Sequence, residues 1–205
     1  MQLYLVRHGQ SGGNAQTQPG PDPPLTELGR RQAALAAARL AGQKFVALHC
    51  SPLRRALQTA DIIGRSLGLA PTIWVELCEK WQDGFRGPTR SEIQQAFPLA
   101  VLPHDMPEDQ WWRPTGDTEE EAYLRAEQLR KRIWETYAGQ DVSVLLITHG
   151  TFGSIMIGHL LECPPCGYTR FSQSNCGISR LDFFEGHWKL RFLNTTHHLP
   201  PEAIT

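Results

Sequence analysis

An unbroken apolar run near the start of the chain, Leu3 to Val6, constrains the fold more than any other feature. Four consecutive apolar residues are typical of a strand buried on both faces, as in a parallel sheet covered by helices. The run stops at Arg7-His8-Gly9, and small polar residues and glycines continue to Asn14. The carboxyl edge of an open α/β sheet binds ligands, glycines let backbone amides approach an anion, and arginine suits phosphate oxygens. This stretch therefore predicts a phosphate site that contains a histidine.

The same construction occurs twice more, which sets it apart from the ordinary polar loop that a single Arg-His-Gly usually forms. The apolar run from Val142 to Thr148 ends in His149-Gly150, and the run from Phe45 to His49 is followed by Arg54-Arg55. Parallel strands present their carboxyl ends on one edge of the sheet. We therefore expect His8, His149 and the arginine pair to converge there.

Alternating strands and helices predict an α/β fold, a three-layer α/β/α sandwich with a mostly parallel sheet and an antiparallel edge hairpin. Glu185-Gly186 between two apolar segments is the hairpin signal. The predicted strands are 3–6, 45–49, 72–75, 142–148, 178–184 and 187–193. The predicted helices are 27–41 after a Thr26 cap, Ser51 (as N-cap) to 67, a brief helix after a Thr89–Glu92 capping box, 117 or 118 to 137, and 152–161.

The chain of 205 residues, with 40% hydrophobic residues, fits a single domain over 1–205. A net charge of −1 without a basic block argues against nucleic acid or an anionic membrane as a partner. No apolar run approaches the ~20 residues that a membrane span needs, and no signal peptide is evident, so we expect a cytoplasmic protein. The oligomeric state is not indicated.

Residues 80–117 form a long, aromatic and proline-rich segment, and a loop of this length in a compact domain is typical of a lid over an active site. It offers aromatic and basic side chains to a substrate: Trp81, Phe85, Trp111, Trp112, Arg86, Arg90 and Arg113. Packing of the tryptophans within the lid is an equally good interpretation.

Cysteine and histidine pairs elsewhere in the chain do not form a convincing metal site. Cys163 and Cys166 have the spacing of a redox or zinc pair, but the second pair that a zinc site needs is missing from the sequence. His197-His198 has no acidic neighbour to support a metal interpretation. We expect no metal and no cofactor.

A phosphate monoester at this edge would meet fixed cations, which can neutralise phosphate oxygens in place of metal ions. Neutral imidazole is a competent nucleophile toward phosphorus, and His8 is placed for it if its other ring nitrogen donates to a backbone carbonyl. The departing alkoxide needs an acid, and Glu79 fits because it lies in the loop just past a strand. Three rival acids cannot be excluded by spacing: Glu76, Asp83 and Glu92.

Several segments, in this order, resemble the histidine phosphatase superfamily, which includes the cofactor-dependent phosphoglycerate mutases. The resemblance covers essentially the whole chain and is carried by residues 5–11 with Asn14, 25–29, 51–60, 148–150 and 194–199. It implies that His8 is the phosphorylated nucleophile, that Arg7, Arg55 and His149 form the phosphate pocket, and that Glu79 donates the proton. It also implies that Asn14 and Gly150 contact the phosphate and that Arg54 is a solvated helix residue.

The chain departs from the family pattern at Gln10, where Glu is common, and after Glu79, where Asp83 replaces a usual glycine. The compact chain resembles the phosphatase branch, because the mutases carry an extra segment after the acid. We therefore expect hydrolysis of a small phosphorylated metabolite, with bulky or aromatic phosphomonoesters preferred to 3-phosphoglycerate. Phosphoglycerate mutase-type transfer, α-ribazole phosphatase activity and an inactive phospho-ligand or protein-binding relative are the alternatives.

Overall fold

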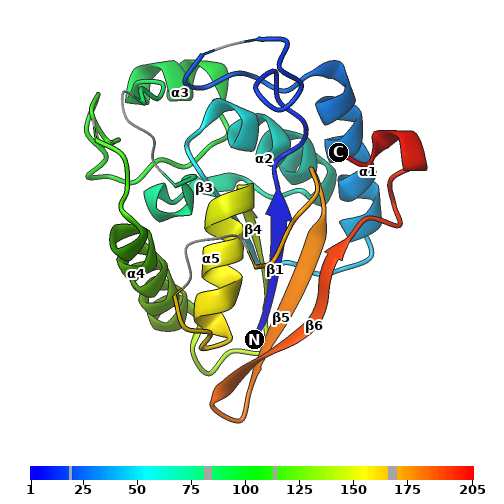
Figure 1. Ribbon diagram of the computed structural model, residues 1–205, viewed down its shortest axis with the longest axis vertical. Helices are drawn as coiled ribbons and strands as arrows, with labels where there is room; N and C mark the ends of the chain where they lie inside the picture. Colours follow the sequence, from blue (N-terminus) through cyan, green and yellow to red (C-terminus); the bar gives the residue numbers. More distant parts are fainter. Residues whose placement is uncertain (19, 81–84, 113–114, 166–169) are drawn as a thin grey trace.

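A computed structural model gives the architecture, and it describes residues 1–18, 20–80, 85–112, 115–165 and 170–205. Six strands form one mixed sheet in the order β3-β2-β4-β1-β5-β6 (Figure 1). Its strands are β1 (Gln2–Arg7), β2 (Ala47–Cys50), β3 (Pro71–Ile73), β4 (Ser143–Thr148), β5 (Ile178–Phe184) and β6 (His187–Thr195). The first four run parallel, whereas β5 pairs antiparallel with β1 and β6 pairs antiparallel with β5. The predicted fold class is confirmed.

Helices cover both faces of the sheet, as the doubly buried strands require. The helices are α1 (Glu27–Leu40), α2 (Arg54–Leu67), α3 (Arg90–Ala96), α4 (Glu119–Tyr137) and α5 (Gly150–Leu160). Tyr4 and Val6 of β1 pack in the cluster that includes α1 and α2, whereas Leu3 and Leu5 pack in the cluster that includes α4 and α5. Alternate residues of one central strand thus anchor two separate hydrophobic layers.

Most predicted helix starts are observed at their capping residues. Thr26 accepts from the Gly29 amide, and Thr89 and Thr118 each form a complete capping box. Ser51 was wrongly predicted as a cap: α2 begins three residues later with Leu53 as its N-cap. The last helix also begins earlier than predicted, at Gly150, directly after β4.

The predicted strand 72–75 is shorter than expected, because β3 ends at Ile73 and a 3₁₀ turn, Val75–Leu77, follows. This turn leads the chain into Cys78 and Glu79 at the carboxyl edge of the sheet. Of the described helices, none combines the length and the apolar composition needed to cross a membrane.

Candidate active site

The nucleophile predicted from the sequence lies directly after β1 and is buried, with His8 only 3% exposed. Its Nδ1 lies 2.7 Å from the carbonyl oxygen of Gly9, so Nδ1 carries the proton and Nε2 keeps its lone pair. Burial, with added repulsion from Arg55 and Arg7, holds the pKa of His8 well below its ordinary value. The imidazole is therefore neutral, which is the form that can attack phosphorus.

Arg55 reaches this ring from the first turn of α2. Its Nε donates to His8 Nε2 at 3.1 Å. The positive end of the helix dipole also favours an anion at this place. Arg54, by contrast, is exposed.

His149 lies at the end of β4 with its ring centroid 5.0 Å from that of His8. It is fully buried, and its Nε2 lies 2.9 Å from Ser51 Oγ. Burial, followed by the charge of Arg55, lowers the pKa of His149 well below its ordinary value. His149 is therefore neutral, and the positive charge around His8 comes from Arg7 and Arg55.

Arg7 is held between β1 and the segment before β5, where its Nη1 donates to the carbonyl oxygen of Gln173 at 2.6 Å. Gly150 lies beside the guanidinium, since a Cβ atom on this residue would lie 3.4 Å from Arg7 Nε, an ordinary van der Waals distance. Burial lowers the pKa of Arg7, and the charge of Glu79 acts in the opposite direction. The structure thus brings Arg7, Gly150 and Glu79 together.

Glu79 closes the site from the loop after the 3₁₀ turn. Its two carboxylate oxygens accept from the amides of Thr151 (3.2 Å) and Phe152 (2.8 Å) in the first turn of α5. The N-cap residue of α5, His149, makes no side-chain hydrogen bond to the first amides of this helix. A carboxylate from a distant loop therefore caps the helix that follows Thr148-His149.

The rival acids have other partners. Glu76 binds Arg132 through both oxygens at 2.8 Å, and Glu92 completes the cap of α3 with Thr89. Asp83 lies outside the described residues. Of the described candidate acids, Glu79 is the one that contacts α5, the helix that begins directly after His149.

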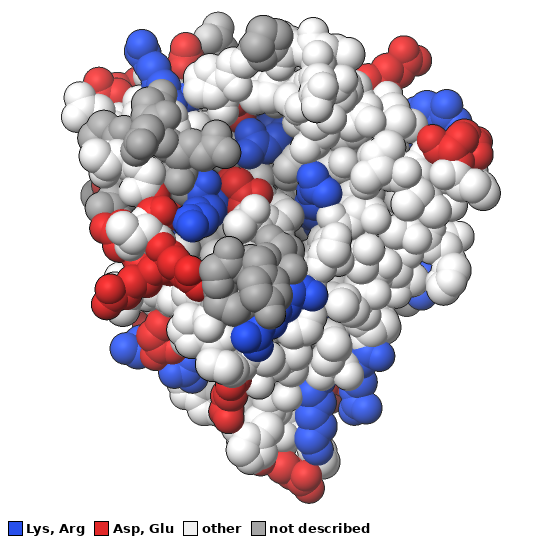
Figure 2. Space-filling model, viewed as in Figure 1, with Lys and Arg blue, Asp and Glu red and all other residues white. Residues whose placement is uncertain are grey.

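Asn14 is exposed at the rim, and its oxygen accepts from the Ser11 amide (3.1 Å), Ser11 Oγ (3.0 Å) and Asn175 Nδ2 (3.3 Å). With the oxygen engaged, the amide nitrogen is the end that can face a phosphate. Figure 2 shows Lys and Arg side chains gathered around the hollow above the carboxyl end of β1, with an acidic side chain among them.

Sequence reasoning missed the side chains that hold these groups in place. Asn175 is buried and donates to the His8 carbonyl at 2.9 Å, and its own amide donates to the Thr205 carbonyl at 2.8 Å. Gln32 accepts from the Gln10 amide and donates to the Ala203 carbonyl, both at 2.7 Å. Residues 203–205 thus support the loop after β1, and no local sequence pattern predicts these contacts.

Arg125 of α4 holds the backbone around Glu79 in place. Its guanidinium donates to the carbonyl oxygens of Glu76 (3.0 Å), Cys78 (2.7 Å) and Glu79 (3.2 Å). The backbone that carries the acid is thereby tied to α4.

The two described tryptophans of residues 80–117 are buried, since Trp111 is 8% and Trp112 is 9% exposed. The rings meet edge to face, with centroids 5.2 Å apart, and Trp111 Nε1 donates to the Pro88 carbonyl at 2.7 Å. Arg90 is equally occupied, donating to the carbonyls of Pro103 and Met106. These contacts support the packing interpretation; Phe85 is half-buried, Arg86 is exposed, and Trp81 and Arg113 lie outside the described residues.

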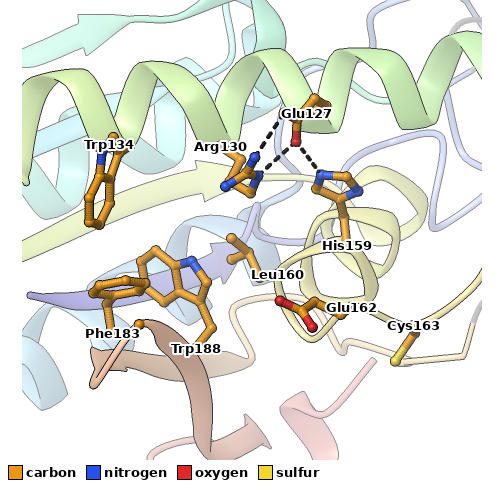
Figure 3. A pocket seen from close by; sticks show the side chains of 10 residues that line it. Glu127, Arg130, Trp134, His159, Leu160, Glu162, Cys163, Phe183 and Trp188 are labelled. Atoms are coloured by element: carbon orange, nitrogen blue, oxygen red, sulfur yellow. Dashed lines mark hydrogen bonds and ion pairs between the residues drawn. The ribbon is translucent and has the colours of Figure 1, made fainter.

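Another part of the molecule holds a cavity of about 710 Å³, at the opposite end of the sheet between α4, the end of α5 and the β5–β6 hairpin (Figure 3). Its polar groups bind one another, because Glu127 accepts from Arg130 at 2.7 Å and lies 2.8 Å from His159 Nε2. None of the predicted site residues lines it. Cys163, beside it, is a free thiol, Cys166 lies outside the described residues, and His198 contacts the Cys176 carbonyl.

Comparison with known proteins agrees with this geometry. The family model of the histidine phosphatase superfamily (branch 1) matches residues 3–196. This chain belongs to the histidine phosphatase superfamily. A probable phosphoglycerate mutase GpmB of Yersinia enterocolitica is 31% identical over 202 residues, covering 92% of this chain and 87% of that protein.

Solved structures of the superfamily share the fold over nearly the whole chain. A mycobacterial glucosyl-3-phosphoglycerate phosphatase is 25% identical, with a TM-score of 0.73 over 95% of this chain and 99% of that one. A putative alpha-ribazole-5'-P phosphatase of Escherichia coli is 26% identical, with a TM-score of 0.74 over 95% and 96%. A phosphoserine phosphatase of Entamoeba histolytica is 25% identical, with a TM-score of 0.72 over 97% and 99%. Superfamily membership supports an enzyme of phosphoryl transfer.

Proposed function

We propose that this protein hydrolyses small phosphomonoesters through a phosphohistidine formed on His8. The observation that carries the proposal is the state of one atom: His8 Nε2 is unprotonated and lies 3.1 Å from the Arg55 guanidinium. A nucleophile and a phosphate-binding cation thus share one place at the carboxyl edge of the sheet.

In the first step His8 Nε2 attacks phosphorus and the bond from phosphorus to the ester oxygen breaks. A proton held on Glu79 passes to the departing oxygen, so the leaving group departs as an alcohol. In the second step water attacks the phosphohistidine, its proton passes to Glu79, and phosphate and neutral His8 are released.

Charge on the phosphoryl oxygens is met by the guanidinium groups of Arg7 and Arg55, an arrangement that needs no metal ion. We expect His149 to donate a hydrogen bond to a phosphoryl oxygen. The negative charge of a bound phosphate dianion raises the pKa of this histidine. Asn14 adds its amide nitrogen at the rim.

Hydrolysis is favoured over mutase transfer by the three structural relatives, whose names are those of phosphatases. The name of the GpmB relative keeps phosphoglycerate mutase activity as the second candidate, and α-ribazole phosphatase is a more specific form of the first. We expect bulky or aromatic phosphomonoesters to be turned over faster than 3-phosphoglycerate.

A chromogenic aryl phosphate in the presence of a chelator tests the proposal, with His8→Ala as the inactive variant. Turnover that survives the chelator and disappears in His8→Ala supports the mechanism. Absence of turnover would favour a binding protein, and turnover that requires metal would contradict the mechanism. A panel of phosphometabolites that includes 3-phosphoglycerate then decides between hydrolysis and transfer.

A further inference from the structure

Asp22 is a buried carboxylate that the phosphoryl-transfer steps above do not use. It lies in the loop between β1 and α1, and its side chain is 9% exposed. Its two oxygens accept from the backbone amide of Arg54 at 3.1 and 2.9 Å, and one of them accepts from Arg55 Nη1 at 3.3 Å. An acidic group next to a phosphate-binding arginine repels the substrate, so its presence calls for a reason.

One role of Asp22 is to cap α2, because the N-cap residue of this helix makes no side-chain hydrogen bond to it. The N-cap residue Leu53 cannot accept a hydrogen bond through its side chain, and Arg54 is the first helical residue. Asp22 supplies the missing acceptor from 32 residues earlier in the chain. The loop is thereby fastened to the helix turn that presents Arg55.

The other role concerns the orientation of the guanidinium. In a planar guanidinium, Nε–H and one N–H of Nη2 point along a common edge, which is the edge that binds two oxygens at once. Nε faces His8 Nε2, whereas Nη1, on the other side, is held by Asp22. The edge that faces His8 is therefore the one suited to two phosphoryl oxygens.

We propose that Asp22 is a positioning residue for phosphoryl transfer: it holds Arg55 so that the Nε–Nη2 edge faces the phosphorus attacked by His8. The inference rests on the proposed function, because it assigns the orientation of a group that binds the phosphate. A misorientation of about 1 Å at such a group costs on the order of 100-fold in rate.

Asp22→Asn separates the capping of α2 from the orientation of Arg55. The Asn oxygen still caps the Arg54 amide, but the negative charge that fixes Arg55 is lost. We expect kcat to fall by roughly 10- to 100-fold. The inhibition constant of inorganic phosphate should stay constant or decrease, because a repelling charge has gone. If Asp22 only ties the loop to the start of α2, Asp22→Asn should raise the inhibition constant of phosphate and lower the melting temperature.

The experiment measures kcat, phosphate inhibition and Tm for wild type, Asp22→Asn and Asp22→Ala. Asp61→Asn is the matched control, because it removes a carboxylate that binds Arg65 on the exposed side of the same helix. In an Arg55→Ala background, Asp22→Asn should cause no further loss of kcat, since the effect passes through Arg55.

An unchanged kcat in Asp22→Asn, or an equal further loss in the Arg55→Ala background, would overturn the inference while wild-type turnover leaves the proposed function standing. A melting temperature lowered as much by Asn as by Ala would assign Asp22 to stability alone. Wild-type protein without phosphatase turnover would refute the proposed function, and the inference with it.

Discussion

Replacing Glu79 by Gln tests the proposed acid, because the change removes the proton and keeps the shape. The carboxylate accepts from two amides of α5, and the Gln oxygen can still accept from one of them. A general acid contributes roughly 10²- to 10⁴-fold to a step with a poor leaving group. We therefore expect kcat for an alkyl phosphate to fall within that range.

The effect should depend on the leaving group. An aryl phosphate with a good leaving group departs without a proton, so kcat in Glu79→Gln should fall much less with that substrate. Steady-state kinetics on a series of aryl and alkyl phosphates gives the dependence directly. Glu76→Gln is the matched control, since this neighbouring carboxylate binds Arg132 instead.

The structural role of Glu79 is measured separately. Glu79→Ala removes the cap of α5, and loss of a cap costs about 0.5–2 kcal/mol. In a chain of 205 residues this lowers Tm by roughly 2–4 °C per kcal/mol, whereas Glu79→Gln, which keeps one acceptor oxygen, should lower Tm less than Glu79→Ala. Equal loss of rate on aryl and alkyl phosphates in Glu79→Gln would refute the assignment of this residue as the acid.

Three further predictions concern stability and the phosphate pocket. Burial lowers the pKa of His49 from 6.5 to about 3, so as the pH falls the unfolded chain binds the proton first. The free energy of unfolding should therefore be unaffected by His49 above pH 6.5 and should fall by roughly 3 kcal/mol between pH 6.5 and pH 4.5. Urea unfolding against pH should show this loss in wild type and a shallower one in His49→Gln. Trp111→Ala should lower the free energy of unfolding by about 3–5 kcal/mol, whereas Trp134→Ala, at an exposed site, should change it far less by the same urea assay. Gly150→Ala should leave the inhibition constant of phosphate within about 2-fold of wild type, because the added Cβ would lie 3.4 Å from Arg7 Nε, an ordinary van der Waals distance. A roughly 10-fold increase in that constant would contradict this expectation.

The sequence predicted the parts of the site that follow strands, because a polar residue after an apolar run marks the carboxyl edge of a sheet whatever its partners are. His8, Arg55 and His149 were placed in this way, and the sheet brings them together. Glu79 was harder, since the chain after β3 carries several acids and only their contacts separate them.

The supporting residues could not be predicted. Asp22 caps a helix that begins 32 residues later, and Asn175 reaches a carbonyl 167 residues away. Such contacts depend on the folded path of the chain and leave no spacing in the sequence. Ser51 shows the opposite error, because serine is a common N-cap residue, yet this side chain does not cap α2 and instead lies beside His149.

The support that residues 203–205 give to the loop after β1 has a consequence for synthesis. About 195 residues separate His8 from Ala203, and at 5–20 residues per second they take roughly 10–40 s to make. Until then Gln32 and Asn175 lack their late partners, and the loop that carries the nucleophile is incompletely held. The loop that carries His8 is therefore made early but is among the last parts of the chain to gain all of its supporting contacts.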